Sequence, residues 1–159
     1  MKLHNKGIVH NDLKLDNVTF SGSVHEPVYH IIDLGWASKT GRVAGDFTPD
    51  ANDDVCRDNN GEEDEAFVGC PWMAPEVRAR QPVYPSGDVY SFGFLLQYLM
   101  QSCKQGFLTE PLGRQAKLCL LLNPACRPSL TEVAEAIAGL RDELLPHQLG
   151  EDFDFVEYE

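Results

Sequence analysis

The feature that most constrains the fold is a polar loop, residues 10–17, held between short apolar runs. Three such runs surround it, at residues 8–9, 18–20 and 29–32. The third run ends at Asp33, two residues before a glycine. Short runs of β-branched and aromatic residues, separated by turn residues, predict strands. Polar loops carried on such strands are a recurrent way to gather metal and phosphate ligands on rigid supports.

The second half of the chain predicts helices. Nine of the residues 89–100 are apolar or aromatic and leave almost no polar face, which predicts a helix over residues 85–100 that is buried all round, with Ser86 as its N-cap. A shorter helix is expected over residues 112–122. Ser129 and Glu132 have the spacing of a capping box, and an apolar stripe follows them to residue 144. The predicted fold class is therefore mainly α with a small β element.

The acidic charge is concentrated in two segments. The net charge is −12, and residues 35–73 hold nine acids against three bases, while residues 146–159 hold five acids and no base. The first segment predicts a long acidic loop, partly disordered, over residues 36–73, and the second predicts a mobile tail. A protein of this charge is a poor partner for nucleic acid or an anionic membrane, so neither is expected.

Cysteine usage and the chain start bear on location. The five cysteines are an odd number without C-x-x-C spacing, which favours reduced thiols over a zinc site or a disulfide framework. The first residues contain no apolar signal core, and the longest apolar run, residues 118–122, is too short to span a bilayer. These features favour a cytoplasmic protein, with a nuclear location as the alternative.

The loop sequence H-x-D-L-K-x-x-N at residues 10–17, followed by D-x-G at 33–35, resembles the catalytic and metal-binding loops of eukaryotic protein kinases. Three later motifs agree in order: F-V-G-C-P-W-M-A-P-E at 67–76, D-V-Y-S-F-G at 88–93 and N-P-A-C-R-P-S at 123–129. Lys14 after Asp-Leu points to the serine/threonine branch. The resemblance implies a protein kinase-like C-terminal lobe over residues 1–145, followed by the acidic tail at 146–159.

The resemblance implies a role for each polar residue of the loop. Asp12 would orient the substrate hydroxyl and accept its proton, and Lys14 would neutralise charge on the transferred γ-phosphoryl group. Asn17 and Asp33 would ligate Mg²⁺, which prefers hard oxygen ligands, and together with Lys14 they would hold ATP. The competing interpretation is that Asp12, Asp16 and Asn17 only form turns. It suits each residue singly, but it does not explain the ordered set of motifs.

Four further residues would support this site from behind. The resemblance assigns His10 to the core, packed against the residue after Asp33, which here is Leu34. Asp88 would accept backbone N–H groups of the loop and clamp it, although an acid at a helix start is also favoured by the helix dipole. Glu76 and Arg127 would form a buried ion pair.

Three departures from the family pattern stand out. The chain begins near the end of a helix closed by Gly7, so the N-terminal lobe of a kinase, with its Gly-rich turn and lysine, is absent from the chain. Asn11 stands where many family members have an arginine that pairs with a phosphate on the acidic segment. Cys70 stands at a threonine that braces the catalytic aspartate and lysine, and its motif is one residue short.

The expected function is that of a protein serine/threonine kinase, which transfers the γ-phosphoryl group of ATP to a protein hydroxyl with Mg²⁺ as cofactor. The isolated chain is expected to be inactive because the N-terminal lobe is missing, and a partner could cover the exposed inter-lobe face. The alternative is a catalytically silent, pseudokinase-like scaffold, or a truncated fragment that acts as a protein-binding module.

Overall fold

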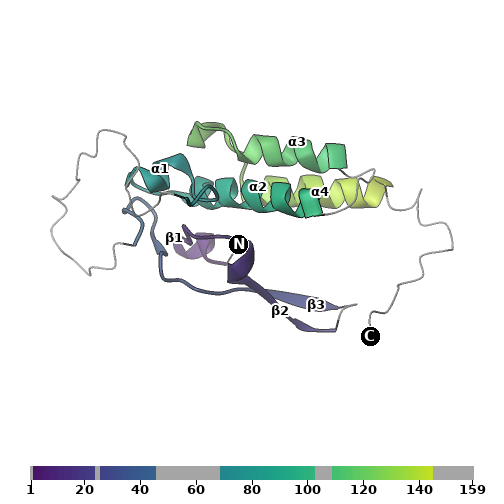
Figure 1. The fold of residues 1–159 in the computed structure, drawn as a ribbon, viewed down its shortest axis with the longest axis horizontal. Helices are drawn as coiled ribbons and strands as arrows, with labels where there is room; N and C mark the ends of the chain where they lie inside the picture. The colour runs from purple at the N-terminus through teal and green to yellow at the C-terminus, as the bar shows by residue number, and fades with distance from the viewer. Residues whose placement is uncertain (1, 24–25, 46–68, 103–108, 145–159) are drawn as a thin grey trace.

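The computed structural model describes residues 2–23, 26–45, 69–102 and 109–144. Their elements are the strands β1 (Ile8–Val9), β2 (Val18–Gly22), β3 (Pro27–Ile31) and β4 (Ser38–Lys39), the helices α1 (Pro75–Arg78), α2 (Pro85–Ser102), α3 (Thr109–Cys119) and α4 (Leu130–Leu144), and the 3₁₀ turns η1 (His4–Lys6), η2 (Leu15–Asn17) and η4 (Pro124–Cys126). The helices gather on one side, and the β2–β3 hairpin extends from the other (Figure 1). This helix-rich arrangement with small sheets agrees with the predicted fold class.

The strands form two antiparallel pairs. β1 pairs with β4, with Val9 opposite Ser38, and β2 pairs with β3, with Val18 opposite Ile31. The three strands predicted around the polar loop are therefore present, and the loop itself runs from the end of β1 through η2 into β2. The predicted C-cap is also present, because Gly7 adopts the left-handed conformation at φ 67° and its N–H bonds the His4 carbonyl.

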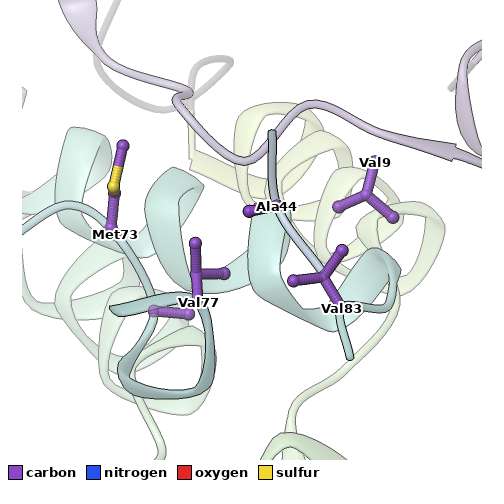
Figure 2. Packing of buried hydrophobic residues seen from close by; sticks show 6 residues of the cluster. Val9, Ala44, Met73, Val77 and Val83 are labelled. Atoms are coloured by element: carbon purple, nitrogen blue, oxygen red, sulfur yellow. The ribbon is translucent and has the colours of Figure 1, made fainter. Parts of the chain in front are cut away.

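Two apolar clusters hold the helices and β1 together. The first joins β1, the acidic loop's start and α1, and Figure 2 shows its members Val9, Ala44, Met73, Val77 and Val83. The second, Val89, Cys119 and Val133, joins α2, α3 and α4. These two clusters place the N-terminal turn of α2 directly behind β1 and the polar loop that follows it, because α2 contacts both β1 and α3.

The tight contact between α2 and α3 depends on a glycine. A Cβ atom built on Gly93 would lie 2.5 Å from the Cβ of Cys119 and 3.1 Å from the Ala116 carbonyl oxygen. Real Cβ atoms essentially never show a contact as short as 2.5 Å, so only glycine lets the two helices approach this closely. The glycine inside an otherwise apolar helix is thus explained by packing.

The prediction that α2 is buried all round is wrong at its C-terminal end, where Tyr98 is 50% and Leu99 43% exposed. An apolar sequence is buried only where neighbours cover each side, and the described helices leave the side of α2 that carries Tyr98 and Leu99 exposed. Ser86 is not the residue before the helix either, since α2 begins at Pro85. The shorter helix, predicted over residues 112–122, runs instead over Thr109–Cys119.

The capping box before α4 is confirmed. The Ser129 N–H donates to Glu132 Oε2 at 2.7 Å, and the Glu132 N–H donates to Ser129 Oγ at 3.2 Å. Because the carboxylate accepts this backbone N–H, the pKa of Glu132 is lowered from its ordinary value. The pair satisfies two N–H groups that the first turn of a helix would otherwise leave unpaired.

Two predictions fall on other parts of the chain. Most of the acidic loop (residues 46–68) and the acidic tail (146–159) lie outside the described residues. Among the helices that the structure describes, none combines the length and apolar character needed to cross a lipid bilayer.

Candidate active site

The polar loop is fixed from behind by Asp88, in the first turn of α2. Its Oδ2 accepts the His10 N–H at 2.8 Å and its Oδ1 accepts the Asn11 N–H at 2.9 Å. These are the contacts expected for Asp88, which is fully buried. His4 also bonds Asp88, through Nε2 at 2.8 Å, and nothing in the sequence pointed to it.

Asp12, Lys14 and Asn17 form one hydrogen-bonded group. The Asn17 amide nitrogen donates to the Asp12 carbonyl at 2.8 Å and to Asp12 Oδ2 at 3.0 Å. The Lys14 ammonium lies 3.2 Å from the same Oδ2. Asp12 and Asn17 are each only 5% exposed, whereas the Lys14 side chain is 30% exposed. The loop thus gathers a carboxylate, an ammonium and a carboxamide at one point.

Asp33 adjoins this group through the backbone. The Ile32 N–H donates to the Asn17 carbonyl at 2.9 Å, so Asp33 directly follows a residue that is hydrogen-bonded to the loop. Its φ is 61°, in the left-handed region that aspartate tolerates better than most residues, and its Oδ1 accepts the Gly35 N–H at 3.0 Å. The turn holds this carboxylate exposed at the end of β3.

The residues fit a magnesium ion. Both hydrogen bonds from the Asn17 side chain to Asp12 use its amide nitrogen. These bonds do not use the side-chain oxygen of Asn17, which is a hard ligand like the exposed Asp33 carboxylate. Within the described residues, no group of three or more His, Cys, Asp or Glu side chains could hold a metal ion. Mg²⁺ does not need one, because it keeps several waters and binds through one or two protein carboxylates together with phosphate oxygens.

His10 lies in the core rather than in the site. Its side chain is fully buried, its Nδ1 accepts the Asp12 N–H at 3.3 Å, and its Nε2 lies 3.2 Å from the Ile32 carbonyl. The ring therefore ties the polar loop to the chain that leads into Asp33. Leu34, predicted to pack against it, is 49% exposed.

Asn11 holds the chain beyond Asp33 with neutral hydrogen bonds. Its amide nitrogen donates to the Trp36 carbonyl at 2.7 Å and to Ser38 Oγ at 2.9 Å, and its φ is 66°. The family resemblance indicated only that Asn11 replaces an arginine. The structure adds that the amide bonds the start of the acidic segment directly, with no charge involved.

Glu76 and Arg127 form the ion pair that the sequence predicted. The Arg127 Nη2 lies 2.9 Å from Glu76 Oε2, and Nη1 bonds the other carboxylate oxygen. The guanidinium also donates to three carbonyl groups, those of Ser86, Leu121 and Leu122, and it is fully buried. The pair joins α1, which follows the acidic segment, to the start of α2 and to the chain before α4.

One site residue was missed altogether. Trp72 donates its indole N–H to Asp12 Oδ1 at 2.7 Å, and its ring lies under the Lys14 ammonium, 5.0 Å from nitrogen to ring centroid. Its only signal in the sequence was its place in a motif that is one residue short.

Several large apolar side chains on the segments next to the site are exposed. They lie on the polar loop, on the β2–β3 hairpin and next to Asp33, and they are 40–69% exposed: Leu15, Phe20, Val28, Tyr29, Ile31, Ile32 and Leu34. We call this set the hairpin patch. Side chains of this size are usually buried, so a set of them left exposed on neighbouring segments is typical of a region that another protein segment covers.

Comparison with known proteins defines the class. The family model of the protein kinase domain matches residues 1–114 of this chain. The chain therefore belongs to the protein kinase domain family. The match includes the polar loop, Asp33, the segment before α1 and the whole of α2.

Individual relatives are kinases of related kinds. The chain is 26% identical over 178 residues to dual specificity testis-specific protein kinase 2 of Rattus norvegicus, a match covering 94% of this chain and 28% of the relative. It is 25% identical over 144 residues to serine/threonine-protein kinase PAK 4 of Homo sapiens, covering 90% and 21%. It is 26% identical over 172 residues to serine/threonine-protein kinase STE20 of Saccharomyces cerevisiae, covering 87% and 16%. The chain thus spans less than a third of the length of these relatives.

Proposed function

We propose that this chain carries the catalytic loop of a protein serine/threonine kinase, within a C-terminal lobe, and that its reaction is transfer of the ATP γ-phosphoryl group to a protein hydroxyl. The observation that carries the proposal is the bonded group of Asp12, Lys14 and Asn17, with Asp33 joined to it through the Ile32–Asn17 backbone bond. Membership of the protein kinase family supports the same reaction.

Each residue of the group has a task that its chemistry suits. Phosphoryl transfer requires positioning and charge neutralisation more than covalent chemistry from the protein. Asp12 orients the attacking hydroxyl and takes its proton on a carboxylate oxygen. Lys14, a compact charge on a flexible stem, is 30% exposed and can turn from Asp12 towards a phosphoryl oxygen.

Asn17 and Asp33 would hold Mg²⁺ through their side-chain oxygens. A magnesium ion held there would supply positive charge to neutralise the negative charge that develops during transfer of the γ-phosphoryl group. The protein contributes rigid placement: Asn17 is fixed by two hydrogen bonds to Asp12, and Asp33 by the bond from the Gly35 N–H.

Residues 1–159 alone are proposed to bind Mg²⁺-ATP weakly and to show no turnover. The hairpin patch adjoins Asp33 and leaves one side of the nucleotide site open to water, which weakens the electrostatic interactions there. A small lobe or another protein packed on this patch would close the site. The same patch also supports the second candidate, a silent scaffold whose partner binds there without phosphoryl transfer.

A phosphate-transfer assay separates these candidates. The chain is tested alone and after addition of a kinase small lobe as a separate protein, beside Asp12→Asn and Asp33→Asn, with the exposed Asp16→Asn as the matched control. We expect turnover only in the completed form, and a loss of about 100-fold or more in the Asp12 and Asp33 variants.

Two results would contradict the proposal. Turnover by residues 1–159 alone that both variants abolish would show that the second lobe is dispensable. Turnover in the completed form that survives both substitutions would remove Asp12 and Asp33 from the reaction.

A further inference from the structure

Trp72 contacts both side chains that are proposed to act on the phosphoryl group and its acceptor. The edge of its ring, at Nε1–H, donates to Asp12 Oδ1 at 2.7 Å. The face of the same ring lies under the Lys14 ammonium at 5.0 Å. Oriented N–H donation to a carboxylate and a cation over an indole face are both favourable interactions, and here one rigid ring provides both.

The ring has a firm support. Trp72 packs against the apolar cluster of Val9 and Met73, and the Met73 N–H bonds the Cys70 carbonyl at 3.0 Å, closing a turn just before α1. A tryptophan side chain has only two rotatable torsions, so once its ring is packed its N–H has a fixed direction. The support therefore reaches Asp12 from the segment before α1, which is 60 residues away in sequence.

The two carboxylate oxygens of Asp12 are bonded by different parts of the chain. Oδ2 accepts from Asn17 and lies beside Lys14, both in the same loop, whereas Oδ1 accepts from Trp72. Loop contacts alone would hold one oxygen and leave the carboxylate plane free to turn. The indole fixes the second oxygen and thereby the plane in which a hydroxyl is oriented.

We propose that Trp72 is a positioning residue for Asp12 and Lys14, in place of the residue at position 70. The family resemblance would give this bracing task to a threonine where this chain has Cys70, and a thiol is a weak donor. With one residue fewer in the motif, the indole reaches the carboxylate instead. This inference rests on the proposed function and names a further residue on which its rate depends.

Hydrogen exchange at the Trp72 indole, measured by NMR on the full ¹⁵N-labelled chain, tests the contact without any activity. We expect Asp12→Ala to accelerate exchange of this N–H by about tenfold or more, the factor that one lost hydrogen bond to a charged group implies. Asp16→Ala, a loss of an exposed acid from the same loop, should leave it unchanged. Equal exchange in the parent and in Asp12→Ala would overturn the inference.

The contact with Lys14 has its own spectroscopic signature. Protons next to the Lys14 ammonium lie over the indole face, so their resonances are shifted upfield by the ring, and Trp72→Leu should remove this shift. Cys70→Ala is the matched control and should keep it. A Lys14 side chain whose resonances respond to Cys70→Ala and not to Trp72→Leu would assign the bracing role to position 70 and overturn the inference.

Turnover of the chain completed by a small lobe distinguishes this inference from the proposed function. We expect Trp72→Phe, which keeps a ring and loses the donor, to lower kcat about tenfold while KM for ATP stays within about twofold. An unchanged kcat in Trp72→Phe would overturn the positioning role and leave the kinase function standing. A parent with no turnover in any form would instead contradict the proposed function and, with it, the catalytic meaning of the contact that the exchange measurement reports.

Discussion

Substitution of Arg127 by alanine is expected to destabilise the fold more than any change at its surface. Arg127 is fully buried and bonds both carboxylate oxygens of Glu76 as well as three carbonyl groups. Its guanidinium also lies 5.0 Å from the ring centroid of Tyr90. Alanine removes all of these interactions at once and leaves the Glu76 carboxylate, itself 9% exposed, without its cation.

The magnitude follows from that stranded charge. Breaking a buried ion pair on one side costs about 3–5 kcal/mol, because the remaining ion stays desolvated and unpaired. Domains of this size are stable by roughly 5–15 kcal/mol, so the loss is a large fraction of the total. At about 2–4 °C per kcal/mol, the midpoint of thermal unfolding should fall by at least roughly 6–12 °C.

Urea denaturation of the parent, Arg127→Ala and Arg114→Ala measures the difference. Arg114 is the matched control because it too pairs with an acid, Glu110, which lies one turn earlier in the same helix. This pair is 3.8 Å apart, and the side chains of Arg114 and Glu110 are 69% and 84% exposed. Such a pair contributes about 0–0.5 kcal/mol. Replacing both members of the buried pair, as Glu76→Leu with Arg127→Met, should recover part of the loss, since no lone charge remains.

A free energy of unfolding for Arg127→Ala within about 1 kcal/mol of that for Arg114→Ala would contradict this prediction. The buried pair would then be worth no more than a surface pair, and the link between α1 and the chain before α4 would have to depend on apolar packing alone.

Three further predictions concern single positions. Gly93→Ala should destabilise the fold by about 1–3 kcal/mol through overpacking against α3. A Cβ on Gly139 would meet nothing within 4 Å, so Gly139→Ala should stabilise α4 by up to about 1 kcal/mol. Urea denaturation of both variants checks that the two changes in the free energy of unfolding have opposite signs. The pKa of Glu132 is lowered below 4.5 in the fold, so the contribution of this carboxylate to stability is present at neutral pH and is lost as pH falls through the lowered value. Glu132→Gln should therefore flatten the acid side of a plot of melting temperature against pH. An unchanged profile would exclude the capping bond as the cause of that acid dependence. Burial raises the pKa of the Cys119 thiol and so lowers the fraction present as thiolate. A thiol reagent should label the exposed Cys126 first and Cys119 only after unfolding. Early labelling of Cys119 would contradict its place in the core.

Local sequence patterns predicted the local structure well. The strands around the polar loop, the Gly7 cap and the capping box at Ser129 and Glu132 depend on residues a few positions apart, and each is present. The ion pair of Glu76 and Arg127, 51 residues apart, was predictable only because family motifs mark both partners.

Contacts that no motif marks could not be predicted. His4 and Asp88 are 84 residues apart, and Trp72 and Asp12 are 60 apart, so which of them meet depends on how α1, α2 and the polar loop pack. The exposed end of α2 has the same origin, because its apolar composition does not reveal how many neighbours the fold supplies. The sequence therefore indicated the residues proposed for the site and gave no sign of the hydrogen bond from Trp72 to Asp12.

Binding of Mg²⁺-ATP to the full chain, followed by NMR, tests whether the polar loop and the turn at Asp33 form a nucleotide site. We expect weak binding, with a dissociation constant of roughly 1 mM or above. Shifts should be centred on the amides of Asn17, Asp33 and Gly35, should need Mg²⁺, and should be lost in Asp33→Asn but kept in Asp16→Asn. Shifts that are absent at saturating Mg²⁺-ATP, or that are unchanged by Asp33→Asn, would contradict the claim that this loop and this turn form a nucleotide site, and would favour the silent scaffold.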